Sequence, residues 1–141
     1  MLSRTADYAV RAVVLLARHY GERLVSADEI ASALGAPRNY MSKTLNALVR
    51  RGLLTSMRGP GGGFALAISP DTLSVATVVD VFADTRPAVA RCLLEDRPCD
   101  PDAPCSAHRR WKSITHMARE PLVGTTIGEL CGTHRSTSVS N

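Results

Sequence analysis

Apolar side chains in the first third of the chain follow helical spacing and predict three helices. The first, residues 3–20, is apolar on two sides and closes at Gly21, so we expect it to be buried, partly against a second subunit. A second helix starts with a capping-box pattern at Ser26-Ala-Asp-Glu29, with the glutamate reaching back, and ends at Gly35. Apolar positions then recur with a period of about 3.6 over residues 38–51, which predicts a third helix.

The segment after the third helix predicts a β-hairpin. Leu53–Met57 and Phe64–Ile68 have the composition of two strands, and the glycine-rich sequence between them, Arg58-Gly-Pro-Gly-Gly-Gly, is a turn. The tight Gly35-Ala36-Pro37 turn joins the second and third helices, and the hairpin follows directly. This order predicts a winged helix-turn-helix.

The rest of the chain is predicted to contain helices separated by one long loop. A helix is expected over residues 72–83, and another starts at Ser106 and runs toward Pro121, which should end or kink it. Thr126–Leu130 has the pattern of a small capped turn, and the Ser/Thr-rich residues 132–141 are expected to be disordered. The predicted fold is therefore mainly α with a small β-hairpin wing.

Composition narrows the class of protein. The 141 residues fit one domain, and with 45% hydrophobic but only 4% aromatic residues its core should consist of Ala, Val, Leu and Ile. No apolar run approaches the ~20 residues that cross a bilayer, and the N-terminus lacks the features of a secretion signal. We therefore expect a cytoplasmic protein with no membrane partner. In that reducing compartment its four cysteines are expected to bind metal or react rather than form disulfides.

Charge is divided unevenly along the chain. Residues 1–68 carry nine basic and four acidic side chains, whereas residues 69–141 carry eight and nine, so a polyanion would bind the first half. The polar face of the third predicted helix has amide, hydroxyl and basic groups but no acid, which suits a DNA groove; an ordinary solvated face is the alternative. This face consists of Asn39, Ser42, Lys43, Asn46 and Arg50.

The hairpin tip is almost pure backbone. Its glycines present no side chains that would block close approach, so the tip can enter a minor groove while Arg58 meets phosphates or the groove floor. A nucleotide-binding loop is the alternative interpretation. It is disfavoured because neither the Gly-Lys-Ser/Thr sequence nor the helix that follows it in nucleotide-binding folds is present.

Possible metal ligands are concentrated in the predicted long loop, at Cys92, Cys99, Cys105 and His108. Prolines stiffen this loop, and four carboxylates against one arginine give it a charge of −3 before any thiol ionises, which favours a bound cation over a nucleophilic thiolate. The close cysteine pairs of structural zinc sites are absent, and widely spaced cysteines suit an iron–sulfur cluster. Spacing alone leaves zinc and reduced thiols open.

The fourth ligand has three candidates, His108, Asp7 and Cys131. His108 follows Cys105 by three residues and can face the same centre, although a lone histidine is as often solvent-facing. Asp7, on the first helix, could reach the loop of a partner subunit. Cys131 is interpreted as a small near-core residue, and His19, His116 and His134 receive no role. An enzyme is not expected, because the acidic loop without Cys-x-x-Cys disfavours a thiol redox catalyst and no other catalytic set is evident.

Several of these motifs together resemble one known family. They are Asp7-Tyr-Ala-Val-Arg11, Asn39-Tyr-Met41, Arg58-Gly-Pro-Gly-Gly-Gly-Phe64, and Cys92, Cys99 and Cys105 with His108 and Trp111. In unbroken order over residues 1–131 they are similar to the Rrf-type winged-helix transcription regulators, the family of the iron–sulfur regulators IscR, NsrR and RirA.

The resemblance implies a homodimer whose long helix crosses its partner, with two winged heads that read a palindromic promoter in double-stranded DNA. It places the winged helix-turn-helix in residues 1–83, the cluster-binding loop and dimerisation helix in 84–131, and the tail in 132–141. By position, the minor groove would be contacted by Arg58, Gly61 and Gly62, and the major groove by Arg38, Asn39, Tyr40, Ser42 and Lys43.

The resemblance also assigns an iron–sulfur cluster to Cys92, Cys99 and Cys105. Some members complete a 2Fe-2S site with a histidine that matches His108, and others complete a 4Fe-4S site with an aspartate of the partner that matches Asp7. Both residues are present here, and the first two cysteines are one residue further apart than in the 2Fe-2S members, so the cluster type stays open.

The implied function is a transcription regulator whose promoter affinity changes with the cluster. It would sense cluster status, redox state, nitric oxide or iron. A winged-helix regulator with a structural zinc or with cluster-free thiol sensing is the alternative.

Overall fold

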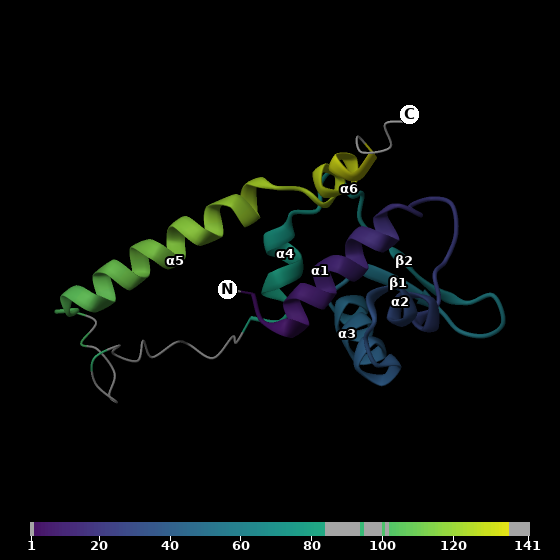
Figure 1. Cartoon of the computed structure of the whole chain (residues 1–141), viewed down its shortest axis with the longest axis horizontal. Helices are drawn as coiled ribbons and strands as arrows, with labels where there is room; N and C mark the ends of the chain where they lie inside the picture. The colour runs from purple at the N-terminus through teal and green to yellow at the C-terminus, as the bar shows by residue number, and fades with distance from the viewer. Residues whose placement is uncertain (1, 84–93, 95–99, 101, 136–141) are drawn as a thin grey trace.

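The computed structural model describes residues 2–83, 94, 100 and 102–135. Helices α1 to α3 and a two-stranded hairpin form the body, α4 and α6 pack on α1, and α5 extends away from the body (Figure 1). The predicted mainly α fold with a small β-hairpin is confirmed. In chain order the elements are α1 (Arg4–Ala17), α2 (Ala27–Leu34), α3 (Arg38–Arg50), β1 (Leu54–Met57), β2 (Gly63–Leu66), α4 (Val75–Asp80), α5 (Ser106–Gly124) and α6 (Ile127–Arg135).

Hydroxyl side chains determine where four of the helices begin. Ser3, Ser26, Ser74 and Thr126 each accept a hydrogen bond at 3.1–3.2 Å from the amide three residues further on. At α6 the capping box is complete, because the Glu129 carboxylate also accepts from the Thr126 amide at 2.7 Å. At α2 the carboxylate of Glu29 binds the guanidinium of Arg23 instead of reaching back as predicted.

The wing is held to the body by its second strand. Strands β1 and β2 pair antiparallel, with Leu54 opposite Leu66 and Met57 opposite Gly63. On its other side, Phe64 exchanges two backbone hydrogen bonds with Val25, at 2.8 and 3.0 Å. Gly63 is buried at this junction, where a Cβ atom would lie 2.5 Å from the Val25 carbonyl oxygen. The residue just before α2 therefore fixes the position of the wing.

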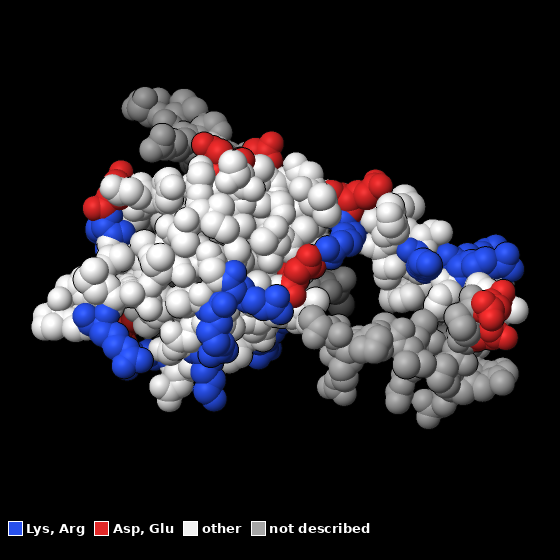
Figure 2. Space-filling view, turned by 180° about the vertical axis from the view of Figure 1, so that it is seen from behind, with Lys and Arg blue, Asp and Glu red and all other residues white. Residues whose placement is uncertain are grey.

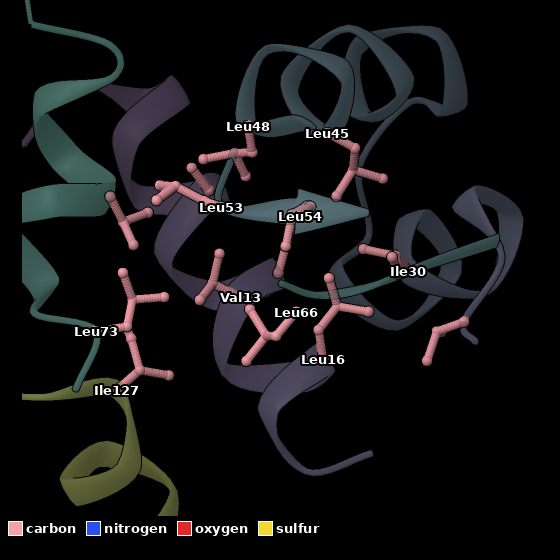
Figure 3. Packing of buried hydrophobic residues seen from close by; sticks show 14 of the residues in the cluster. Val13, Leu16, Ile30, Leu45, Leu48, Leu53, Leu54, Leu66, Leu73 and Ile127 are labelled. Atoms are coloured by element: carbon pink, nitrogen blue, oxygen red, sulfur yellow. The ribbon is translucent and has the colours of Figure 1, made fainter. Parts of the chain in front are cut away.

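One hydrophobic core joins the helices to the hairpin (Figure 3). Its side chains are aliphatic, as the low aromatic content predicted, and include Val13, Leu16, Ile30, Leu45, Leu48, Leu54, Leu73 and Ile127. Thr44 is the only buried polar residue in the described part of the chain, and its hydroxyl donates to the Tyr40 carbonyl at 3.0 Å. The core thus fixes the inner face of α3.

Helix α5 is almost entirely exposed and none of its residues is buried. It is tied to α4 by Arg119, whose guanidinium donates two hydrogen bonds, at 2.7 and 2.8 Å, to the Asp80 carboxylate. This guanidinium lowers the pKa of the Asp80 carboxyl below its ordinary value. Of the two outcomes predicted for Pro121, an end or a kink, the end is wrong, because α5 continues to Gly124. Proline removes one helical N–H, and on an exposed helix water can satisfy the carbonyl that loses its donor.

Several other boundaries differ from the predicted ones. Helix α1 ends at Ala17 with Arg18 as its C-cap, not at Gly21, and β2 spans Gly63–Leu66 rather than Phe64–Ile68. The helix expected over residues 72–83 is confined to Val75–Asp80, because Ser74 caps it and the chain turns after Asp80. The expected small turn at Thr126 begins the nine-residue α6, whose Ile127 is fully buried. Residues 132–135 of the predicted tail are therefore helical, and 136–141 lie outside the described residues. Within the described part, no helix combines the length and hydropathy required to span a lipid bilayer.

Candidate DNA interface and cluster site

Helix α3 has a buried apolar face and an exposed polar face. Met41, Leu45 and Leu48 are fully buried, and the opposite side carries exposed Asn39, Lys43, Asn46 and Arg50. Residues 30–70, which contain α3 and the wing, include five basic and no acidic residues. Figure 2 shows Lys and Arg side chains gathered on the lower part of the body, where α3 and the hairpin lie. The surface around α3 is therefore suited to a polyanion.

The first turn of α3 presents backbone amides and a basic side chain. Its N-cap is Pro37, which makes no side-chain capping hydrogen bond. Arg38 forms an ion pair through Nε with Asp28 in the first turn of α2, and both side chains are well exposed. Amides at a helix N-terminus that lack a side-chain cap attract anions, so this turn can receive a phosphate.

Tyr40 and Ser42 are placed differently from the exposed residues of α3. Ser42 is half-buried, and Tyr40 is half-buried with its hydroxyl 2.5 Å from the hydroxyl of Thr5 on α1. The Tyr40 ring also packs edge-on against Tyr8, with 5.8 Å between ring centroids and 71° between ring planes. The described contacts of the Tyr40 side chain are thus with α1.

The wing tip presents backbone and one guanidinium. Arg58, Gly59, Pro60 and Gly61 are all exposed, and Gly59 and Gly61 have φ values of +99° and +74°. These left-handed conformations favour glycine, because a Cβ atom would clash with the backbone. Gly62 donates its N–H to the Gly59 carbonyl at 2.9 Å, and a Cβ atom on it would collide with the Met57 carbonyl oxygen. The shape of the tip therefore depends on its glycines.

Two candidate ligands of the cluster come together at the start of α5. Cys105 is the N-cap, and its sulfur accepts from the His108 amide at 3.4 Å. Both residues are half-buried. Since the N-terminal end of a helix favours negative charge, this position suits a thiolate. Cys92 and Cys99 lie outside the described residues, and within the described part no three His, Cys, Asp or Glu side chains form a group that could hold a metal ion.

Asp7 lies in the first turn of α1, where its carboxylate pairs with Nε of Arg11 at 3.0 Å. Cys105 lies at the end of α5 remote from the body, so Asp7 and Cys105 of one chain are not brought together (Figure 1). Cys131 is half-buried against the core, and its thiol donates to the Val14 carbonyl at 3.5 Å, in agreement with the predicted near-core role.

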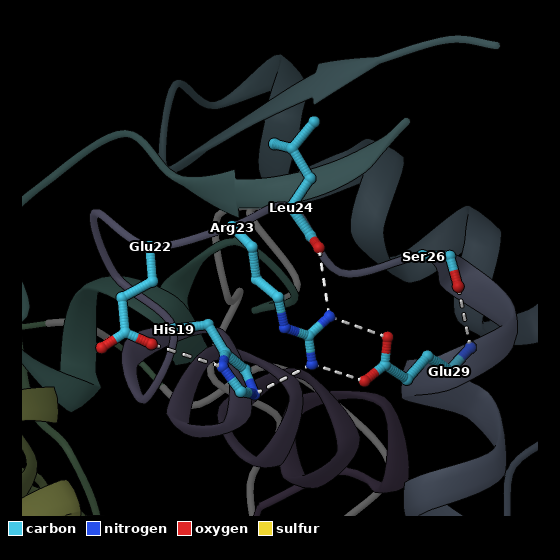
Figure 4. A network of polar contacts seen from close by, with 6 residues as sticks. All are labelled: His19, Glu22, Arg23, Leu24, Ser26 and Glu29. Atoms are coloured by element: carbon cyan, nitrogen blue, oxygen red, sulfur yellow. Dashed lines mark hydrogen bonds and ion pairs between the residues drawn. The ribbon is translucent and has the colours of Figure 1, made fainter. Parts of the chain in front are cut away.

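A polar network not predicted from the sequence joins the loop after α1 to the start of α2 (Figure 4). The guanidinium of Arg23 donates to both carboxylate oxygens of Glu29, at 2.7 and 3.0 Å, and to the Leu24 carbonyl at 3.3 Å. It also lies 3.4 Å from Nε2 of His19 at the end of α1. Arg23 lowers the pKa of Glu29 below its ordinary value. The network orders the loop that leads to Val25.

Comparison with known proteins assigns the family. A model of the Rrf2 proteins, described as iron-dependent transcriptional regulators, matches residues 2–133. The chain belongs to the Rrf2 family. An HTH-type transcriptional regulator of Aquifex aeolicus (strain VF5) is 34% identical over 132 residues, covering 92% of this chain and 90% of that protein. The HTH-type transcriptional regulator IscR of Aliivibrio salmonicida (strain LFI1238) is 30% identical over 129 residues, covering 92% of this chain and 76% of that protein.

Solved structures agree with the Rrf2 assignment at the level of the fold. T. potens IscR matches with a TM-score of 0.82 at 23% identity, covering 100% of this chain and 93% of that chain. CymR, the global cysteine regulator of B. subtilis, matches with a TM-score of 0.76 at 23% identity, covering 94% of this chain and 97% of that chain. This Rrf2 chain is a transcriptional regulator, and its relatives are regulators rather than enzymes.

Proposed function

We propose that this Rrf2 protein is a dimeric DNA-binding regulator whose operator affinity is set by an iron–sulfur cluster on Cys92, Cys99 and Cys105. The observation that carries the DNA-binding part is that residues 30–70, which contain α3 and the wing, hold five basic and no acidic residues within a chain of the Rrf2 family. In this proposal Arg38, Asn39, Ser42 and Lys43 face the major groove. Arg58, Gly61 and Gly62 meet the minor groove.

The cluster proposal is supported by the donors at the start of α5. Cys105 accepts a backbone N–H at its sulfur, as cluster-bound thiolates commonly do, and His108 lies one turn further along the helix. The family model describes iron-dependent regulators. The cluster supplies redox and ligand-exchange chemistry when bound. Cys105 would hold the cluster at the start of α5, and either His108 or the partner subunit's Asp7 would complete the set of ligands.

The dimer proposal rests on the exposed side of α5. Trp111, Ile114 and Met117 repeat every three residues and have relative exposures of 52%, 57% and 70%. Large apolar side chains at such spacing on one helix form a stripe that needs a partner surface. A second copy presents the same stripe, so pairing across a two-fold axis covers both. Two α3 helices would then face successive half-sites of a palindrome.

Regulation follows from linkage between the cluster site and the DNA. The loop joins α5 at Cys105, so the thiolates can determine how α5 begins. A cluster that binds more tightly to one arrangement of the two winged helix-turn-helix units favours that arrangement. Operator affinity then changes by the difference between the cluster's binding free energies in the two arrangements. Anaerobic purification followed by an absorption spectrum and by iron and acid-labile sulfide assays tests whether the cluster is present.

Replacing Cys99 with Ala should remove the cluster and with it the control of DNA binding. Operator affinity is measured by fluorescence anisotropy, with operator fragments selected from random DNA and with protein before and after anaerobic reconstitution. We expect the two wild-type states to differ by about 5- to 150-fold and the two variant states not to differ. Cys131→Ala is the matched control and should behave as wild type. A Cys99→Ala protein that keeps acid-labile sulfide and its response would contradict the ligand assignment.

Replacing Arg58 with Ala should weaken operator binding at least about fivefold and reduce the slope of log affinity against log salt concentration by about 1. The reason is the loss of one exposed guanidinium at the tip of the wing. Titrations at several salt concentrations measure both quantities. Arg18→Ala, an equally exposed arginine at the far end of α1, should change neither. A wild-type slope in Arg58→Ala would show that this side chain stays off the DNA.

A further inference from the structure

The first turn of α3 is attached to the first turn of α1. The hydroxyl oxygens of Tyr40 and Thr5 are 2.5 Å apart, and the Tyr40 and Tyr8 rings meet edge to face with centroids 5.8 Å apart. Both contacts join segments more than 30 residues apart in the sequence, which lie side by side in the structure (Figure 1). Hydrogen bonds and edge-to-face ring contacts are directional, so they restrict the orientation of α3 beyond the apolar packing that already holds its inner face.

The side chain of Tyr40 points in a different direction from those of its neighbours on α3. Asn39 and Lys43 on either side are exposed, whereas Tyr40 is half-buried against α1. The turn that it belongs to starts at Pro37, which supplies no side-chain cap. The Tyr40 carbonyl also accepts from the buried Thr44 hydroxyl at 3.0 Å. Tyr40 therefore stabilises, through its side chain, a turn whose own sequence leaves it uncapped.

The residues on α1 that hold Tyr40 flank Asp7. Thr5 and Tyr8 are in the same helical turn as Asp7, whose carboxylate is bound to Arg11. A helical turn moves as a unit because its backbone is hydrogen-bonded within itself. Asp7 therefore belongs to the same helical turn as the two side chains that contact Tyr40.

We propose that Tyr40 is a positioning residue that sets the orientation of the α3 first turn from α1, through the Thr5 hydroxyl and the Tyr8 ring, and does not itself contact DNA. Arg38 and Asn39, which share that turn, are then aimed at the groove by α1. The proposal rests on the proposed DNA-binding function and names a determinant of it. It replaces the role in the major groove that the family resemblance assigns to Tyr40.

The test is a double-mutant cycle with Tyr40→Phe and Thr5→Val, each of which deletes a hydroxyl and keeps the shape of the side chain. Each single variant should weaken operator binding about three- to tenfold, because a lost hydrogen bond frees the turn. The double variant should bind the operator with the same affinity as the single variant of lower affinity. All three variants should keep the wild-type slope of log affinity against log salt concentration. If Tyr40→Phe weakens binding and Thr5→Val does not, the hydroxyl contacts DNA and the proposal is wrong.

A readout without DNA separates this proposal from the proposed function. The amides of Met41 and Ser42 in the full-length protein should exchange with solvent about three- to tenfold faster in either single variant, since the turn opens more often. Tyr20→Phe, an exposed tyrosine beyond α1, is the control and should leave both amides and operator affinity unchanged. Wild-type exchange rates in both variants overturn the positioning role. Failure of wild-type protein to bind any selected operator, with exchange still accelerated, refutes the DNA-binding function alone.

Discussion

Gly63→Ala is expected to destabilise the protein by about 2 to 4 kcal/mol and to abolish high-affinity DNA binding. A Cβ atom at this position would lie 2.5 Å from the Val25 carbonyl oxygen and 2.6 Å from its carbonyl carbon, both of them backbone atoms. The backbone segments around Val25 and Gly63 must move apart, which breaks the two hydrogen bonds between Val25 and Phe64. Because Val25 is fully buried, the freed backbone groups cannot all reach water. The wing would then lose its fixed place beside α3.

Urea unfolding at a fixed protein concentration measures this effect, with Gly61→Ala as the matched control. Gly61 has open space around its Cβ position and a φ of +74°, so alanine there meets only backbone strain of about 1 kcal/mol. We expect Gly63→Ala to unfold at a clearly lower urea concentration than Gly61→Ala. Equal midpoints would mean that the contact with Val25 does not constrain the wing.

Leu48→Ala is expected to lower the free energy of unfolding by about 2 to 5 kcal/mol. Leu48 is fully buried on the inner face of α3, and its carbonyl accepts from the Leu53 amide where the chain turns into β1. Deleting the side chain leaves a cavity between α3 and the hairpin, which loosens both parts of the DNA interface.

Thermal or urea unfolding of Leu48→Ala is compared with Leu94→Ala. Leu94 has a relative exposure of 71%, so its truncation should change stability by no more than about 0.5 kcal/mol. A loss in Leu48→Ala as small as that of Leu94→Ala would contradict the placement of Leu48 in the core.

The helices and the wing could be predicted because their signals are local. Ser26 and Gly35 mark the ends of α2, and the buried residues Met41, Leu45 and Leu48 follow the spacing of one helical face. The connections among these elements are not local. Nothing in the sequence near Val25 indicates that it pairs with Phe64, and the Arg23–Glu29 and Asp80–Arg119 ion pairs depend on the completed fold.

The candidate site shows the same division. The exposed faces of Asn39 and Lys43 follow from helical periodicity, and so does the proximity of Cys105 and His108. The direction of Tyr40 does not follow from periodicity, because it is determined by Thr5 and Tyr8 on another helix. Pro121 illustrates the opposite error. A local rule predicts that α5 ends or kinks at Pro121, whereas the helix continues to Gly124 because the backbone of this exposed helix tolerates the missing donor.

The crowded backbone around Gly62 and Gly63 also limits how this lineage can acquire new target sequences. At both positions any side chain larger than hydrogen would strike main-chain oxygen, whereas Asn39, Lys43 and Asn46 stand in open solvent and can be exchanged without disturbing the core. Under the proposed function, changes in recognition should therefore accumulate on one face of α3, while Gly62 and Gly63 are retained.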